Sequence, residues 1–456
     1  VTPDVGAIEV EKIRKSLYDV IITEKYEQLP MFHKYESDPL LKEYLAIGYM
    51  NWGSSLGNLG EETRGVDAIL YFNQAIEKFK YAIYLMPDDA MSYYLWGNAL
   101  GSLGRASTGD SSINYFKQAI EKYEHSISLE PDNAMPYYLW GNTLASLGDE
   151  SKGAMATNYY EQAIAKYEYA ISLEPNNADS YNNWGNTLIS LGNASTGEAT
   201  INYFKQAIEK CQQATILKPD ASPYNNWGIS LYGLGLETEG VEGINYFKQA
   251  IEKFEQAISF ESDNGDYYIN WGNALHKLGQ ATTGIEAKNY FNQAIDKYEQ
   301  AVSLDPADEE VYRNWGNLLS DLGHASEGAE AINYFKQAMN KYEQAISLDP
   351  NYADVYDDSC STLIHLSYIC GKEERAVLLN QALTVARKRY SIDGMSYNLS
   401  CCYALLGDAA NAFKYLEETL QKEEIKFADV ATDRDWDQLR AHTEYLRLKD
   451  QYNEEQ

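Results

Sequence analysis

The chain has 456 residues and a formal net charge of −31, because 68 Asp and Glu residues outnumber 37 Lys and Arg residues. A surface this acidic repels phosphate backbones and anionic lipids, which argues against nucleic-acid binding and favours a neutral or basic protein or peptide partner. No apolar run reaches the about 18 residues that a membrane span requires, so we expect no membrane insertion.

The five cysteines are Cys211, Cys360, Cys370, Cys401 and Cys402. An odd number gathered late in a long chain is typical of buried free thiols in a reducing compartment. We therefore expect a cytoplasmic location or another reducing compartment. Because the first residue is Val rather than Met, an organelle fits as well if a transit peptide was removed.

Residues 1–45 are predicted to form an N-terminal helical cap. Val10, Ile13, Leu17 and Ile21 recur at the spacing of an amphipathic helix, and prolines interrupt the segment that follows. A stack of repeats exposes an apolar surface at each end, and this helix is expected to cover the first one.

A pattern of Tyr, Trp-Gly, Leu and Leu-Gly recurs seven times between residues 46 and 352. Its tryptophans are Trp52, Trp96, Trp140, Trp184, Trp227, Trp271 and Trp315, spaced by 44 residues except for one step of 43. Such a fixed period predicts seven copies of one structural unit rather than separate domains.

Each unit contains two apolar patterns with helical spacing, which predict two antiparallel helices. In residues 90–133 the first includes Trp96 and the second includes Phe116 and Tyr123. Neither helix can bury its apolar face alone, so stacking of successive pairs is expected. The tryptophans share the face of the core leucines, so we interpret them as core residues rather than as an aromatic cage.

Three kinds of glycine are distinguished by their place in the unit. Gly97 lies within the apolar face and predicts close approach of a second helix, and Gly104 is predicted to end the first helix as a C-cap. The link between the two helices carries a glycine at its fifth place in every unit, which predicts a turn with positive φ followed by an extra helical turn. These link glycines are Gly65, Gly109, Gly153, Gly197, Gly240, Gly284 and Gly328.

The positions of Trp96-Gly97, Leu100, Gly104, Ala119, Tyr123 and Pro131 resemble the tetratricopeptide repeat. The resemblance implies an all-α solenoid, an α-α superhelix of antiparallel helix pairs without a β-sheet. The units differ from that repeat in having Trp where Leu is usual and ten additional residues between the helices. Lengthened repeats of this kind are similar to bacterial repeat arrays, and plant mitochondrial import receptors of the Tom20 type also carry them.

The end of the chain departs from the pattern. Residues 353–394 are interpreted as a degenerate eighth repeat, because Ser359 stands where Trp is expected. Residues 395–422 return to the ordinary repeat length, and residues 423–456 are similar to the closing module of many bacterial arrays. We therefore expect a C-terminal cap in which Trp436 packs inside.

The concave face of such a solenoid is lined by the first helices, and it is the candidate site for a partner. Along the chain this face is first apolar and aromatic, including Met135, then rich in amides, and finally mixed. The candidate partner-binding residues are Met50, Met91, Tyr94, Leu95, Asn98, Tyr138, Leu139, Asn142, Asn182, Asn186, Asn226, Asn270, Asn273, Arg313 and Asn317. The hypothesis is that the apolar part binds an apolar segment while the amides hold an extended backbone.

Two alternatives remain open for this face. The asparagines are also explained as ordinary choices of the repeat, and residues 1–40 of the same chain would also serve to cover the apolar part. A clamp for a peptide carboxylate is disfavoured, because only Arg313 and Asn317 match its pattern and the next helix offers Asp357 and Asp358, which repel a carboxylate.

Catalysis finds little support in the sequence. The six histidines, His33, His125, His276, His324, His365 and His442, share no regular place, and His125 and His276 are expected to face solvent. No metal-ligand, nucleophile or phosphate-loop pattern is present, so we expect no enzymatic activity, no cofactor and no metal. The predicted function is a non-enzymatic protein–protein interaction scaffold; the alternative is a permanent structural subunit of a larger assembly.

Overall fold

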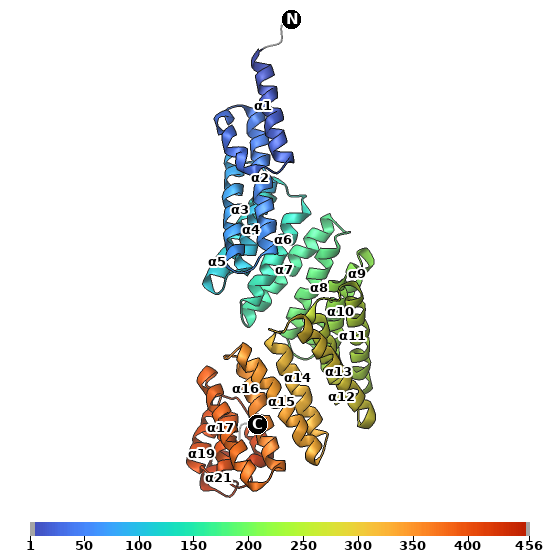
Figure 1. Ribbon diagram of the computed structural model, residues 1–456, viewed down its shortest axis with the longest axis vertical. Helices are drawn as coiled ribbons and strands as arrows, with labels where there is room; N and C mark the ends of the chain where they lie inside the picture. Colours follow the sequence, from blue (N-terminus) through green and yellow to red (C-terminus); the bar gives the residue numbers. More distant parts are fainter. Residues whose placement is uncertain (1–4, 453–456) are drawn as a thin grey trace. The chain divides into compact units, whose positions relative to one another are not determined.

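The computed structural model describes residues 5–452, and all regular secondary structure among them is helical (Figure 1). No strand occurs in this part of the chain, which confirms the all-α fold of paired antiparallel helices. The chain divides into two compact units, Val1–Thr238 and Glu239–Gln456. None of the helices built by the described residues is both long enough and apolar enough to cross a membrane.

The first unit begins with two elements of the cap and continues with helix pairs. Its elements are α1 (Val5–Ile22), the 3-10 helix η1 (Tyr26–Tyr35), α2 (Pro39–Glu62), α3 (Val66–Leu85), α4 (Ala90–Arg105), α5 (Asp110–Leu129), α6 (Ala134–Asp149), α7 (Ala154–Leu173), α8 (Ala178–Asn193), α9 (Glu198–Leu217) and α10 (Ala221–Leu236).

The second unit continues the alternation and ends in short elements. Its elements are α11 (Gly240–Phe260), α12 (Gly265–Gln280), α13 (Gly284–Leu304), α14 (Glu309–His324), α15 (Gly328–Leu348), α16 (Ala353–Ile369), α17 (Lys372–Asp393), α18 (Tyr397–Leu406), α19 (Ala409–Gln421), α20 (Phe427–Thr432), the 3-10 helix η2 (Arg434–Trp436) and α21 (Thr443–Tyr452).

The even-numbered helices from α2 to α18 are the first helices of the repeats, and the odd-numbered helices α3 to α19 are the second helices. Within each of the two compact units, a first helix packs along the second helix that follows it and against the second helix that precedes it. Successive first helices also touch, α2 through α10 in the first unit and α12 through α18 in the second. The first helices of each unit therefore share one face, as predicted.

The link glycines adopt the predicted conformation. All seven have positive φ, between 56° and 69°. L-residues with a side chain rarely adopt this conformation, so glycine is required at each turn. A second helix starts at or directly after each of them, which confirms that part of each insert extends the second helix.

The prediction that Gly104 is a C-cap is wrong. Helix α4 continues through it to Arg105, and a Cβ added to Gly104 would lie 2.5 Å from the ring of Phe116 on α5. The same contact recurs at Gly60 with Phe72. Gly97 makes a close approach to the Tyr123 ring, as predicted, with 2.6 Å to an added Cβ. In α2, α4, α6, α12 and α14, two glycines of the first helix thus receive two aromatic rings of the second helix that follows.

The repeat tryptophans pack at the edge of the core rather than at its centre. Trp315 is 9% exposed and the other six are partly buried. One face of the indole ring is covered by a Lys of the second helix of the same repeat. The pairs, with the distance from Nζ to the ring centroid, are Trp52–Lys78 (3.8 Å), Trp96–Lys122 (4.4 Å), Trp140–Lys166 (3.4 Å), Trp184–Lys210 (3.7 Å), Trp271–Lys297 (3.8 Å) and Trp315–Lys341 (3.3 Å).

This arrangement combines burial with a cation–π contact. Burial lowers the pKa of Lys78, Lys166, Lys297 and Lys341, which shows that the ammonium groups lose part of their hydration above the rings. The core interpretation therefore holds for the packing of the indoles, with the correction that the rings of these six pairs lie under a lysine side chain.

Both ends of the array are covered. Leu17, Ile21 and Leu29 pack with Leu45 and Leu85 of the first helix pair, so the cap closes that end. Helix α2 begins at Pro39, inside the segment 1–45. At the other end Trp436 is fully buried beside Phe413 and Tyr445, which confirms its role in packing.

The cysteines are free thiols. Cys211, Cys360, Cys401 and Cys402 are buried and Cys370 is partly buried. This confirms the prediction of buried thiols, including the adjacent pair Cys401-Cys402 in α18.

The glycine–aromatic contact predicts opposite effects for two substitutions in α2. Gly60→Ala should destabilise the protein by about 1–3 kcal/mol, because the new methyl group overlaps the Phe72 ring. Gly57→Ala should stabilise it by about 0.5–1 kcal/mol, because nothing lies within 4 Å of an added Cβ there and alanine favours the helix. Urea unfolding of both variants measures the difference, and equal stabilities would contradict the packing role of Gly60.

Candidate functional site

In the first unit, the candidate residues of repeats 1–3 form an apolar strip on the first-helix face. Met91 is 43% exposed and Met135 is 38% exposed. Tyr94, Leu95 and Leu139 are partly buried against the core below. The strip therefore offers exposed methionine side chains beside partly buried aromatic and leucine side chains.

Three further members of the set differ in their surroundings. Met50 packs against the cluster that contains the N-terminal cap, so its neighbourhood is partly covered by the chain itself. Asn98 and Leu95 line a small cavity of about 70 Å³ between α2 and α4. Burial raises the pKa of Tyr94 and Tyr138 above the ordinary value of a tyrosine.

The amides of α6, α8 and α10 form a ladder of hydrogen bonds. Asn183 Nδ2 donates to Asn142 Oδ1 (2.9 Å) and to the Tyr138 hydroxyl (3.0 Å), and Asn226 Nδ2 donates to Asn182 Oδ1 (3.0 Å). The Tyr167 hydroxyl also donates to Asn142 Oδ1 (2.8 Å). These amides bind one another from helix to helix, which favours a role in fixing the spacing of the repeats. Asn186, by contrast, is exposed.

In the second unit the candidate residues are held by side chains of the same unit. Asn273 Oδ1 and Asn317 Oδ1 accept hydrogen bonds from the Tyr298 and Tyr342 hydroxyls, each at 2.7 Å. Asn270, three residues before Asn273 on α12, is partly buried.

Arg313 is already neutralised. Its Nε donates to Asp358 Oδ2 at 2.7 Å, and its Nη1 lies 3.4 Å from Asp354 Oδ2. Asn317 Nδ2 donates to the same Asp358 oxygen at 3.2 Å. A guanidinium group that is already paired with two carboxylates binds a third carboxylate poorly. This agrees with the prediction that the chain does not form a clamp for a peptide carboxylate.

A polar pocket of about 310 Å³ lies on the first-helix face of the second unit. His276, Asp321, His324 and His365 line it, together with the candidate residue Asn317. The prediction that His276 faces solvent is wrong: it is 8% exposed, and its Nε2 lies 2.7 Å from Asp321 Oδ2. His125, in contrast, is exposed as expected, with its ring beside Tyr93.

The Asp321 carboxylate is the electrostatic centre of this pocket. Burial alone would raise its pKa, but the hydrogen bond and charge of His276, together with the Gln280 amide (2.5 Å), outweigh that effect and lower it. The rings of His324 and His365 touch each other, with centroids 4.4 Å apart, and burial lowers the pKa of His365. The Nδ1 atom of each ring lies 2.8 Å from a backbone carbonyl of its own helix.

The sequence contains a signal for this pocket that the predictions did not use. Lys277, Asp321 and His365 occupy one place of the repeat, 44 residues apart, and the same place holds small polar residues such as Ser102 and Ser146 in the first unit. A comparison of that place among the repeats would have shown the change from small polar residues to charged residues and histidine.

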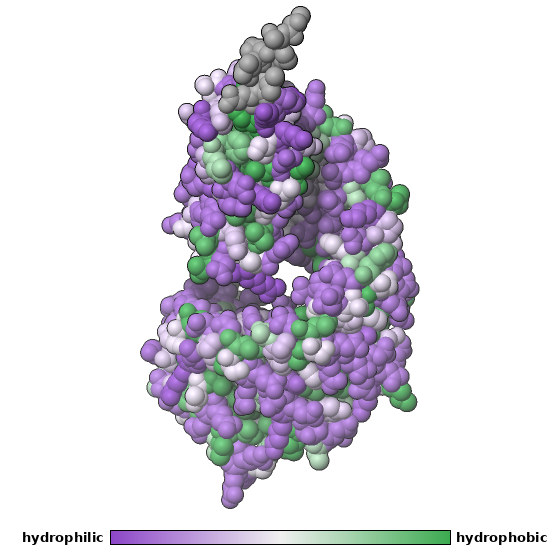
Figure 2. All heavy atoms as spheres, turned by 45° about the horizontal axis from the view of Figure 1, so that its top comes forward, coloured by the Kyte–Doolittle hydropathy of each residue, from purple (hydrophilic) through white to green (hydrophobic). Residues whose placement is uncertain are grey.

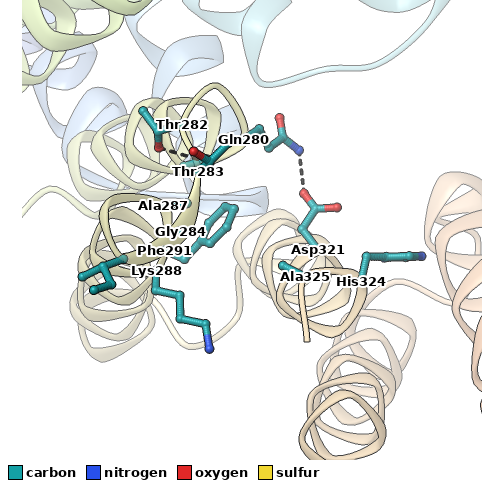
Figure 3. A pocket seen from close by; sticks show the side chains of 12 residues that line it. Gln280, Thr282, Thr283, Gly284, Ala287, Lys288, Phe291, Asp321, His324 and Ala325 are labelled. Atoms are coloured by element: carbon teal, nitrogen blue, oxygen red, sulfur yellow. Dashed lines mark hydrogen bonds between the residues drawn. The ribbon is translucent and has the colours of Figure 1, made fainter. Parts of the chain in front are cut away.

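A second pocket of about 700 Å³ lies beside the first, between the α12–α13 link and α14. Figure 3 shows Gln280 turned toward Asp321 and the Phe291 ring directed toward the space between these helices. Its lining is mainly apolar, including Ala287 and Ala325, with Lys288 at the edge. The two pockets share Gln280, Asp321 and His324, so they adjoin near the end of α14.

One cluster among residues 5–452 has the composition of a metal site. The ligand atoms of Cys401, Asp433 and Asp435 lie within 4.8 Å of one another. The Tyr397 hydroxyl donates to Asp433 Oδ2 at 2.6 Å, and the Tyr368 hydroxyl donates to Asp435. These bonds join α16 and α18 to the C-terminal cap, so the cluster is explained as a structural network.

Two family models match parts of the chain. The model of the plant-specific mitochondrial import receptor subunit TOM20 matches residues 241–388, and the model of the tetratricopeptide repeat matches residues 155–192. The second match joins α7 to α8, which is a second helix and the first helix after it. The helix pairs are tetratricopeptide-type repeats, lengthened by the inserts described above. No curated protein matches the chain.

Several solved repeat proteins are similar in fold. A tetratricopeptide repeat protein from Parabacteroides merdae is 13% identical over 68% of this chain and 98% of its own, with a TM-score of 0.42. A thermophilic one from Thermus thermophilus is 15% identical over 49% and 98%, with a TM-score of 0.36. YrrB, described as having an unusual peptide-binding site, is 17% identical over 52% and 97%, with a TM-score of 0.34.

The hydrogen bonds of Asp321 predict a pH-dependent effect of Asp321→Asn. The pKa of this carboxyl group is lowered by folding, so its stabilisation is present above the unfolded pKa of about 3.9 and is lost as the pH falls through the lower folded value. The variant should be less stable by about 1 kcal/mol at pH 7, since the side chain is 35% exposed, and the difference should shrink at pH about 3.

The matched control is Glu161→Gln, which changes an exposed carboxylate in the middle of α7, away from both helix ends. It should leave stability unchanged at both pH values. Thermal unfolding at pH 7 and pH 3 measures both variants. A loss of stability in Asp321→Asn that is the same at the two pH values would contradict the lowered pKa.

Proposed function

We propose that the protein is a non-enzymatic scaffold that holds a partner polypeptide on the face formed by its first helices. The observation that carries this proposal is the exposed apolar strip of Met91 and Met135, bounded by Tyr94, Tyr138 and Leu139 on the two successive first helices α4 and α6. Rigid helices that each present one variable row of side chains are the usual recognition surface of helical repeats. Methionine side chains adapt to different apolar partners.

The charge of the chain limits the chemistry of the partner. A net charge of −31 favours a neutral or basic polypeptide, and the apolar strip favours a segment with exposed apolar side chains. The amide ladder supports the proposal indirectly. Because Asn142, Asn182 and Asn226 are bonded between α6, α8 and α10, they hold the spacing of the first helices that follow the strip, so a partner that extends along them meets a preorganised surface.

A permanent place in a larger assembly is the second candidate. Several large apolar side chains are highly exposed at the start of the second helices, among them Val66 at 81% and Ile285 at 82%. Figure 2 shows, on the face in view, small hydrophobic patches separated by hydrophilic residues. A permanent interface is usually larger and more continuous than the patches on this face.

The proposal predicts that charge placed on the strip weakens binding. Met91→Glu and Met135→Glu should each lower the affinity for a partner by about tenfold or more, because an apolar contact is replaced by a charge that the partner must desolvate. Met155→Glu is the matched control, since Met155 is 61% exposed but lies on the second helix α7. Partners are captured with photo-crosslinking residues at positions 91 and 155, and their affinities are measured with purified protein.

A polypeptide crosslinked at position 91 but not at position 155, and weakened by the strip substitutions alone, supports the proposal. Equal effects at both positions, or crosslinks at position 155 only, would move the binding surface to the second helices. Far-UV circular dichroism of the three variants checks that each remains folded.

A further inference from the structure

The eighth repeat and the second helix that precedes it depart from the other repeats at three places that meet in space. Ser359 of α16 stands 44 residues after Trp315, and Val385 of α17 stands 44 residues after Lys341. On α15, Met339 takes the place that Ile295 holds one repeat earlier. The indole, the lysine that covers it and an adjoining wall residue are thus all exchanged at this one point of the array.

The earlier repeats show what normally fills this place. The Trp96 ring lies between two second helices, with Lys80 of α3 on one side (5.7 Å to the centroid) and Lys122 of α5 on the other (4.4 Å). Trp315, the last of the series, packs in the same core cluster as Ile295 and Val302 of the preceding second helix. An indole ring therefore occupies the gap between successive second helices, above its own first helix.

In the eighth repeat that gap is a pocket of about 440 Å³. Its walls come from three neighbouring helices, α15, α16 and α17 (Figure 1), and consist mainly of Met339, Ile346, Leu363, Leu366, Leu378 and Val385. Ser359 lies at its base, 1% exposed, and its hydroxyl donates to Met339 Sδ at 3.7 Å. Lys336, Glu343 and Gln381 are exposed at the rim.

The neighbouring exchanges in the same repeat behave differently. Cys360 replaces the glycine of Gly316, and Ala386 replaces Tyr342, whose ring covers that glycine. The side chain at position 360 is larger than the glycine it replaces, and the side chain at position 386 is smaller than the tyrosine it replaces. The volume is therefore refilled, and both residues are buried. At Ser359 and Val385 both partners shrink together, so the space is not refilled by the described residues.

We propose that this pocket binds an aromatic side chain, an indole or a ring of similar size, from a partner polypeptide. The chain itself identifies the occupant, because the equivalent gaps in seven other repeats are built to receive an indole. The volume is within the range of ligand pockets, and a flexible methionine wall adapts to a ring that enters from outside. Large aromatic side chains are also the commonest anchors of protein interfaces.

The pocket lies among the second helices, so this inference is independent of the binding surface proposed above. The substitutions Met91→Glu and Met135→Glu should leave the pocket unchanged. Binding at the pocket and binding at the first-helix strip are therefore distinguishable, and either one can fail without the other.

The direct test uses the full chain and the tripeptide N-acetyl-Gly-(5-fluoro-Trp)-Gly-amide, followed by 19F NMR. Saturable binding is expected, and an unlabelled tripeptide with Trp should displace the probe whereas the same tripeptide with Ala should not. Ser359→Trp restores the indole of the other repeats and should weaken binding by at least about tenfold, because the side chain fills the pocket. Its thermal unfolding midpoint should equal or exceed that of the parent protein.

Val385→Lys serves as the second variant, because the tighter binding expected of it cannot result from a folding defect. It places a lysine where the other repeats have one over the indole, so it should bind the probe about two- to fivefold more tightly. Absence of saturable binding, unchanged binding by Ser359→Trp, or weaker binding by Val385→Lys would each overturn the proposal. Binding of 5-fluoroindole without binding of the tripeptide would overturn the polypeptide partner and indicate a small aromatic ligand.

Discussion

The stacking of this protein depends on an indole ring held between successive second helices and covered by a lysine. The ring removes apolar surface from water, and the lysine stem lies along it while the ammonium group approaches the ring face, 3.3 Å from the centroid at Trp315. The lowered pKa of several of these lysines shows the desolvation that the contact costs. Because the same contact recurs from repeat to repeat, it fixes how each helix pair sits on the one before it.

Because the indoles and lysines pack between the second helices, the exposed face of the first helices is available for recognition. Glycines such as Gly97 and Gly104 let the aromatic rings of the second helix approach the first helix closely. The two helices of a repeat therefore pack through this side of the first helix, and the side chains on its opposite side are not needed for that packing. In the first unit they form the methionine strip and the amide ladder. In the second unit they form the pocket around Asp321, with Arg313 already paired. The eighth repeat, which has Ser359 in place of the indole, has a pocket at that position.

The regular features of the fold were predictable from the sequence, and the features that depend on contacts between repeats were not. Period, helix pairing and the positive φ of the link glycines follow from local patterns. Gly104 was misassigned because a C-cap glycine and a close-packing glycine near a helix end look alike in sequence. His276 was misassigned because its burial depends on Asp321, 45 residues further along the chain. The amides were predictable as a row, but their mutual hydrogen bonds depend on the distance between helices.

The central claim is tested most directly by a double-mutant cycle on Trp315 and Lys341, using Trp315→Ala, Lys341→Met and the double variant in urea unfolding. The account predicts a loss of about 3–5 kcal/mol for Trp315→Ala, since the ring is 9% exposed, and a favourable coupling of about 0.5–1 kcal/mol between the two residues. A loss below about 1 kcal/mol for Trp315→Ala, or additive effects without coupling, would contradict it.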